Sequence, residues 1–139
     1  MGKRILASVF FCLWVQVGLA AGNASGQEVV KVAILPFKVY APDREKLAGW
    51  PMRLTEILSR ELAKDERIIL VGEEKIQEAL ARAGPVEIDE RLARGIGRTV
   101  DTDYIITGSI TQVGGSVSLD ARILDVYLEG VLASAFTAG

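Results

Sequence analysis

Two segments with a hydrophobic period of two residues, joined by Gly114-Gly115, constrain the fold most. Residues 103–113 are rich in Tyr, Ile, Thr and Val, and within residues 117–123 Val, Leu, Ala and Ile alternate with Ser, Asp and Arg. Such alternation buries one face of a strand, and two glycines between alternating segments favour a hairpin. This part of the sheet is therefore predicted to be antiparallel, with a turn at 127–130 and a last strand at 131–136.

The first half of the domain has short apolar strands separated by amphipathic segments. Val32–Leu35 is apolar without alternation, as in a strand covered on both faces. Pro36 has no N–H to donate and should end the pairing of that strand, so residues 38–49 are expected to form a long connection. The other predicted elements are a helix with Pro51 in its first turn and an apolar stripe at Leu54, Ile57, Leu58 and Leu62, a strand at 67–71, a helix at 73–83, and a helix that follows the N-cap Asp89 and has Leu92, Ile96 and Val100 on its apolar face.

The order of these elements defines the fold class. A strand, a helix and a second strand in succession imply a parallel pair, whereas the later strands pair in antiparallel fashion. We therefore expect residues 29–139 to form one mixed α/β domain with the order β-α-β-α-α-β-β-β. Its sheet is expected to contain about five strands, parallel and antiparallel, packed against about three helices.

The amino-terminal segment has the layout of a secretory signal peptide. Gly2–Arg4 is positively charged, residues 5–19 are mostly apolar, and small residues precede a polar stretch. The apolar run is shorter than the roughly 20 residues that span a bilayer. We expect cleavage after Ala20, with Gly22 and Ala24 as nearby alternatives, and a flexible leader at 21–28. We also expect export to the periplasm or the outer-membrane periphery, without a transmembrane helix in the mature chain.

Residue types that are missing narrow the possible chemistry. The chain has no histidine, and its single cysteine, Cys12, lies in the segment expected to be removed. The mature chain therefore cannot use His or Cys catalysis, disulfides, or metal sites built on these residues. Without Lys3 and Arg4, the chain has 14 basic and 18 acidic residues, which gives a net charge of −4 and no basic surface for nucleic acid. We expect no enzymatic activity, no cofactor and no metal.

Three motifs could be taken for ligand sites, but each has a simpler interpretation. Gly95-Ile96-Gly97 lacks the third glycine of a dinucleotide loop and precedes a strand, so helix termination or close packing explains it better. Paired carboxylates in first helical turns, Glu73-Glu74 and Asp89-Glu90, fit the helix dipole. The remaining set of aspartates has no calcium-loop spacing and is interpreted as capping or solvated: Asp101, Asp103, Asp120 and Asp125.

The connection at 38–49 is the most open candidate for an interaction surface. It follows the carboxyl end of a predicted parallel strand, where ligands bind in α/β sheets, and long loops in small domains are often functional. We single out Pro42, Asp43, Arg44 and Trp50 as a possible interaction surface. Trp50 is the sole tryptophan of the mature chain, and either it anchors an interface or it fixes the start of the helix onto the sheet.

Several segments together resemble the TolB amino-terminal-domain-like and FlgO-like proteins of the bacterial cell envelope. The curli secretion protein CsgG has a periplasmic domain related to those of this group. The resemblance covers residues 29 to 137 and implies an α/β domain that acts by protein contact in envelope, secretion or flagellar assembly, with no catalytic residues to carry over. It is carried by Val32–Phe37, the helix with Leu54, Ile57 and Leu58, Gly97, Asp103–Ile110 and Ser116–Val126.

Two departures from this group shape the functional prediction. Lipid-anchored members begin with a cysteine after the signal, which the mature chain lacks, and members continue past the last strand. We therefore expect a fragment, a truncated product, or the amino-terminal module of a longer outer-membrane or repeat protein. The preferred function is a non-enzymatic exported domain that binds another envelope protein, or its own copies, through sheet-edge and loop surfaces. The alternative is a periplasmic sensor module that binds a small ligand in a crevice near residues 36–50.

Overall fold

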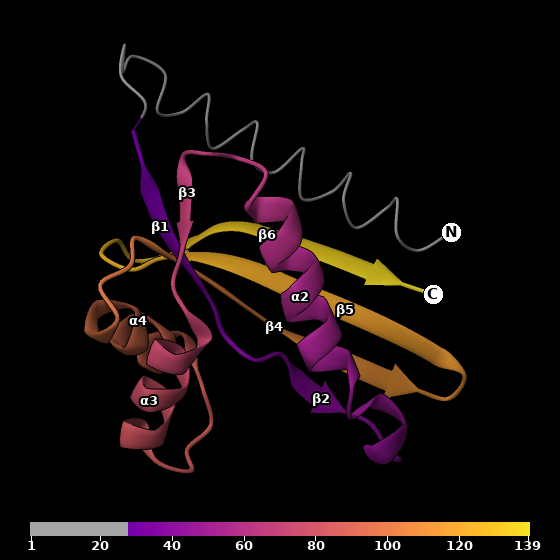
Figure 1. Ribbon diagram of the computed structural model, residues 1–139. Helices are drawn as coiled ribbons and strands as arrows, with labels where there is room; N and C mark the ends of the chain where they lie inside the picture. The colour runs from indigo at the N-terminus through magenta and orange to yellow at the C-terminus, as the bar shows by residue number, and fades with distance from the viewer. Residues whose placement is uncertain (1–27) are drawn as a thin grey trace.

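Six strands form one mixed sheet in the computed structural model, which describes residues 28–139 (Figure 1). The predicted signal peptide, and the predicted leader up to residue 27, lie outside the described residues. The strand order is β3-β1-β4-β5-β6, and β2 also pairs with β4. The strands are β1 (Val30–Ile34), β2 (Lys38–Tyr40), β3 (Ile68–Leu70), β4 (Tyr104–Val113), β5 (Ser116–Asp125) and β6 (Val131–Ala138).

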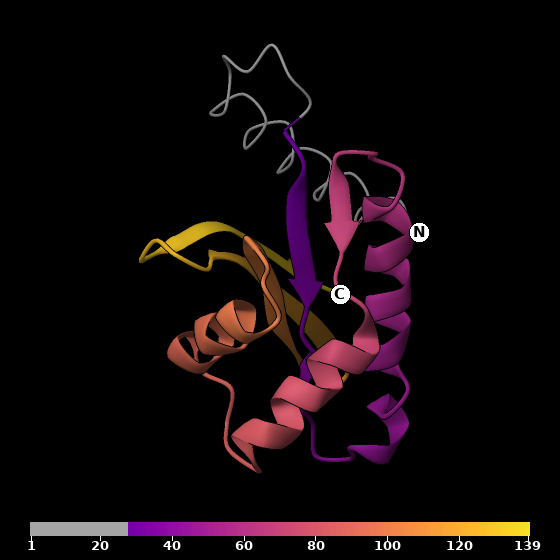
Figure 2. The same ribbon diagram turned by 60° about the vertical axis from the view of Figure 1, so that its left-hand side comes forward.

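Helices lie on both faces of the parallel part of the sheet. The helix α2 (Trp50–Leu62), preceded by the short 3-10 helix η1 (Glu45–Leu47), packs on one face, and α3 (Glu73–Ala83) and α4 (Glu90–Thr99) pack on the other. Figure 2 shows β1 between α2 and the pair α3 and α4. No helix within residues 28–139 is long and apolar enough to cross a lipid bilayer.

Two apolar clusters, one on each face, explain the unbroken apolar run of the first strand. Successive residues of β1 point to opposite faces, so Val32 and Ile34 join the α2 cluster while Ala33 and Leu35 join the cluster under α3 and α4. Ile57, predicted on the buried stripe of α2, is 37% exposed. It lies at the margin of a stripe that the three buried leucines of this helix, each four residues from the next, already define: Leu54, Leu58 and Leu62.

The structure confirms the predicted mixed α/β architecture. The strands β1 and β3 are parallel neighbours joined through α2, and β4, β5 and β6 are antiparallel. The β4–β5 hairpin turns at Gly114-Gly115, where Gly114 has a φ of +60°. The predicted cap of α4 is present, because the Asp89 carboxylate accepts a hydrogen bond from Leu92 N at 2.7 Å.

The predicted long connection at 38–49 needs correction at its start, because Lys38–Tyr40 form the strand β2. Pro36 does end the β1 pairing with β4, which stops at Ile34 opposite Ile106, but pairing resumes at Lys38 opposite Ser109. The four residue steps from Ile34 to Lys38 therefore lie opposite only three on β4, from Ile106 to Ser109, as at a β-bulge. The side chain of Phe37 is buried in the α2 cluster at this point. A three-residue strand after a proline carries too little pattern to be recognised from sequence.

Candidate functional site

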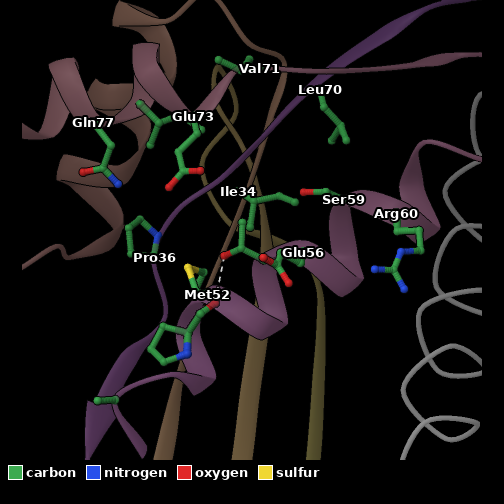
Figure 3. Close-up of a pocket in the computed structure, with 14 residues that line it drawn as sticks. Ile34, Pro36, Met52, Glu56, Ser59, Arg60, Leu70, Val71, Glu73 and Gln77 are labelled. Atoms are coloured by element: carbon green, nitrogen blue, oxygen red, sulfur yellow. Dashed lines mark hydrogen bonds between the residues drawn. The ribbon is translucent and has the colours of Figure 1, made fainter.

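A groove opens between α2 and α3 beyond the carboxyl ends of β1 and β3 (Figure 3). The two strands are parallel neighbours, but the chain leaves β1 toward α2 on one face and leaves β3 toward α3 on the other. Adjacent parallel strands whose connections diverge in this way leave a crevice, which is the usual ligand position in α/β sheets. The groove has a volume of about 620 Å³, within the range of small-ligand sites.

The groove has an apolar floor and a partly polar rim. Ile34 and Ile76 are buried beneath it, and the exposed thioether of Met52 forms part of the α2 wall. Figure 3 shows Glu73 and Gln77 on α3 facing Met52 and Glu56 on α2 across the groove. The remaining lining residues are Pro36, Ala48, Pro51, Thr55, Ser59, Arg60, Leu70 and Val71.

None of the residues singled out from sequence lines this groove. Pro42, Asp43 and Arg44 form an exposed turn, in which Asp43 pairs with Lys46 at 3.2 Å. Trp50 is the first residue of α2 and is 44% exposed. Its neighbours on the chain, Ala48 and Pro51, line the groove. An interaction role for the four residues stays a prediction, whereas the predicted crevice near residues 36–50 coincides with one end of the groove.

Sequence analysis missed the groove residues on α2 and α3. Glu73 was interpreted only as a first-turn carboxylate, and Glu56 and Gln77 were not singled out, because the sequence does not show that these two helices meet at one end of the sheet. Met52 was the available signal, since it is a large apolar side chain outside the buried stripe and is 65% exposed.

The outer edge of the sheet at β6 is a second exposed surface. The segment Val131–Ala138 contains no charged residue and no proline. Val117 and Gly139 exchange two backbone hydrogen bonds, of 2.8 and 3.0 Å. Because bonded and non-bonded pairs alternate between antiparallel strands, Ser134, Phe136 and Ala138 direct their N–H and C=O groups away from β5.

The side chains of β6 are exposed except for Ala133, Ala135 and Thr137, which are half-buried, and Ala133 packs against the α2 cluster. Phe136 is 69% exposed and lies opposite Asp120 of β5, while Ser134 lies opposite Arg122. Asp120 and Arg122 form an exposed ion pair, with Oδ1 and Nε 3.5 Å apart. Within residues 28–139, the edge therefore presents backbone groups that no further strand pairs with, beside an exposed aromatic ring.

The turn that leads into β6 is held by Arg94 of α4. The guanidinium donates to the carbonyl oxygen of Asp125 at 3.0 Å and to that of Gly130 at 2.6 Å. The Asp125 carboxylate accepts hydrogen bonds from the backbone N–H groups of Tyr127 and Leu128 at 2.8 and 2.9 Å. The side chains of Tyr127 and Leu128 are exposed, so the turn presents two large apolar groups whose backbone is held by hydrogen bonds.

The aspartates considered as metal ligands act separately. Asp101 forms an ion pair with Lys31 at 2.8 Å, and the Asp103 carboxylate accepts from Lys31 N at 2.8 Å. The hydrogen bond from Lys31 and its positive charge lower the pKa of Asp101, and the hydrogen bond to Asp101 and its negative charge raise the pKa of Lys31. Within residues 28–139, no three His, Cys, Asp or Glu side chains gather as metal ligands.

The close-packing interpretation of Gly95-Ile96-Gly97 is confirmed for Gly97. A β-carbon on this glycine would lie 2.6 Å from Val126 Cγ2 and 3.0 Å from Ile105 Cδ1. Gly95 has no atom within 4 Å of the corresponding position. Only the second glycine of the pair is needed for packing.

Comparison with known proteins gives matches among solved structures. No protein-family model and no curated protein matches the sequence. The C-terminal domain of LpoB from Salmonella enterica is 19% identical with a TM-score of 0.63, over 91% of this chain and 92% of that one. The same domain from Escherichia coli is 18% identical with a TM-score of 0.62, over 91% and 94%. The lipoprotein GNA1162 from Neisseria meningitidis is 16% identical with a TM-score of 0.60, over 78% of each chain.

At these identities the likeness establishes a shared fold. It agrees with the α/β domain that the resemblance to TolB-like envelope proteins implies. Membership of a FlgO-like group stays a prediction.

Proposed function

We propose that this chain is an exported, non-enzymatic domain that binds another protein of the bacterial cell envelope by adding a strand of that protein to β6. The amino-terminal pattern of a signal peptide supports export. The fold shared with GNA1162, a lipoprotein, supports a location in the envelope. Each of these observations concerns location, and the contact itself is argued from β6.

The uncharged edge of β6 carries the proposal. Sheet edges are normally protected by charged side chains, proline or short length, because free backbone groups pair readily with other strands. This strand is eight residues long and has neither charge nor proline. Its outward N–H and C=O groups at Ser134 and Phe136 can pair with an extended partner segment, and the Phe136 ring can contact that segment from one face.

Surface contacts account for the shifted pKa values of the carboxyl groups. The carboxyl groups with a lowered pKa, those of Asp65, Glu87 and Asp101, each form a surface ion pair with a basic residue. These ion pairs account for the lowered pKa values. The hydrogen bond from Arg67 lowers the pKa of Asp65, and the hydrogen bond from Lys38 lowers that of Glu87. The proposal therefore includes no chemical step.

A proline on the edge tests the contact. Ser134→Pro removes an outward N–H but no hydrogen bond to β5, so proline should be tolerated in the fold. With a photo-cross-linking residue in place of Phe136, we expect an adduct with an envelope protein from intact cells, lost with Ser134→Pro and kept with the control Ser134→Ala. The same adduct with Ser134→Pro, in a variant with an unchanged Tm, would contradict strand addition. An adduct of twice the mass of the chain would assign the edge to a second copy.

The groove between α2 and α3 supports a second candidate, a ligand-binding sensor module. Its position beyond the carboxyl ends of β1 and β3 is the observation that favours this function. Of the predicted surface residues Pro42, Asp43, Arg44 and Trp50, only Trp50 lies near the groove along the chain, between the lining residues Ala48 and Pro51. A thermal-shift screen with nucleotides, sugars and peptidoglycan fragments tests this candidate, and a Tm rise of several degrees with one of them would support it.

A further inference from the structure

We propose that the groove between α2 and α3 binds a short extended peptide segment in which apolar side chains alternate with lysine or arginine. The proposal goes beyond strand addition at β6, because it assigns a separate site on the opposite side of the parallel strands. It is argued from the length of the groove, the chemistry of its floor and the charges on its rim.

The length of the groove fits a peptide. Its α2 wall extends from Pro51 to Arg60, ten residues whose nine steps span about 13.5 Å of helix. An extended segment advances about 3.3 Å per residue, so about four residues match this wall. The opposite wall is the first turn and a half of α3, from Glu73 to Gln77, together with the end of β3.

The floor of the groove selects apolar side chains. Ile34 and Ile76 are buried beneath it, and Leu70 and Val71 are half-buried at its upper end. An apolar side chain placed here would remove this surface and its own surface from water, which is favourable in proportion to the area. The exposed Met52 can adjust to side chains of different shape, because its thioether chain is unbranched and flexible.

The rim selects positive charge. Glu56 lies on the α2 wall and Glu73 on the α3 wall, and within residues 28–139 neither carboxylate has an ion-pair partner within 4 Å. Arg60 is the one basic residue that lines the groove, and Figure 3 shows it at the far end from Pro36. A lysine or arginine that extends between the two glutamates would meet both carboxylates, and an acidic segment would be repelled.

Fluorescence anisotropy with labelled tetrapeptides and the full chain tests the proposal. The probes are acetyl-Leu-Lys-Leu-Lys and the matched sequences in which glutamate or serine replaces lysine. We expect saturable binding of the lysine peptide, weaker binding of the serine peptide and no binding of the glutamate peptide. Equal binding of the lysine and glutamate peptides, or no binding of the lysine peptide, would overturn the proposal.

Variants of the rim give the matched comparison. Glu56→Gln with Glu73→Gln should weaken binding of the lysine peptide by about three- to tenfold, because two solvent-exposed charge contacts are lost. Glu74→Gln is the control, since it removes the same charge from the same helical turn at a residue that does not line the groove. An equal loss with Glu74→Gln, or no loss with the double variant, would refute a specific role for the rim.

Two further measurements separate this site from the alternatives. Ser134→Pro should leave peptide binding unchanged, so failure of strand addition at β6 and failure of the groove proposal can be told apart. Pentylamine carries the charge and the apolar body of one lysine side chain. Complete displacement of the peptide by pentylamine at equal concentration would show a site for small organic cations and would overturn the peptide proposal.

Discussion

Gly97 of α4 packs so closely against Val126 that a β-carbon on the glycine would lie 2.6 Å from Val126 Cγ2. Ile105 of β4 closes the same space from a second side, 3.0 Å from that position. Val126 and Ile105 are fully buried. The absence of a side chain at Gly97 therefore sets how near α4 approaches the sheet.

We predict that Gly97→Ala destabilises the domain by about 1–3 kcal/mol, because an added methyl group overpacks a closed core. Gly95→Ala is the matched control in the same helix, since its β-carbon would meet nothing within 4 Å. It should stabilise by about 0.5–1 kcal/mol through the helix preference of alanine. Urea unfolding followed by circular dichroism measures both changes, and equal effects of the two substitutions would contradict this packing.

A second difference in stability is predicted for the Arg94 clamp, the pair of hydrogen bonds that Arg94 donates to the turn before β6. Arg94→Ala removes the donors to Asp125 O and Gly130 O and should cost about 1–3 kcal/mol, because two hydrogen bonds from a charged donor are lost, one of them to a part-buried carbonyl. The amides of Tyr127 and Leu128 should exchange with deuterium faster, since the turn that holds them loosens. Arg91→Ala, at an exposed position of the same helix, is the control. Unchanged exchange of the turn in Arg94→Ala would show that the clamp does not order it.

A third difference in stability is predicted for Gly108 of β4, which lies at the bulge after β1. A β-carbon here would lie 2.5 Å from Phe37 Cε1 and would also clash with the backbone carbonyl oxygen of Asp120. Gly108→Ala should therefore cost at least about 2 kcal/mol, since a neighbouring strand must move. Phe37→Leu should not restore the Tm of Gly108→Ala, because the contact with the strand remains. Full recovery in the double variant would assign the whole effect to the ring.

The hydrophobic pattern was sufficient to predict most of the fold. The period-two segments on either side of Gly114-Gly115 gave the β4–β5 hairpin, and the unbroken run at Val32–Leu35 gave a strand buried on both faces. Both predictions rest on which faces are buried, which periodicity records directly. The strand β2 was missed because Lys38–Tyr40 is short, and its pairing depends on the bulge at Pro36 and Phe37.

The candidate site was less accessible to sequence reasoning. The position of a crevice near residues 36–50 could be inferred, because it follows from the carboxyl end of a parallel strand. The opposing wall could not be inferred from the sequence. Glu73 and Gln77 line the groove because the chain leaves β1 and β3 toward opposite faces of the sheet, and the sequence does not show this arrangement. Charge pairs across the fold, such as Lys31 with Asp101, were equally hidden, since the two residues lie 70 positions apart.

The ion pair between Lys31 and Asp101 predicts a dependence of stability on pH. The hydrogen bond and charge of Lys31 lower the folded-state pKa of Asp101 below its unfolded value, so the contribution of Asp101 is present above the unfolded pKa. It is lost as the pH falls through the folded pKa. The pKa of Lys31 is raised by the same pair, so its contribution is present below the unfolded pKa of lysine and is lost as the pH rises through the folded value.

Asp101→Asn isolates this charge, because Asp101 has a φ of +56° and asparagine tolerates that conformation. We expect the difference in unfolding free energy between wild type and Asp101→Asn to be constant near neutral pH and to shrink in acid. Lys31→Met should remove the same acid dependence, even though Lys75 also lowers the pKa of Asp101 slightly. Urea titrations at a series of pH values measure the difference, and 1 M salt should reduce it because the pair is exposed. A difference that stays constant through the acid range would show that the pair contributes nothing to folding.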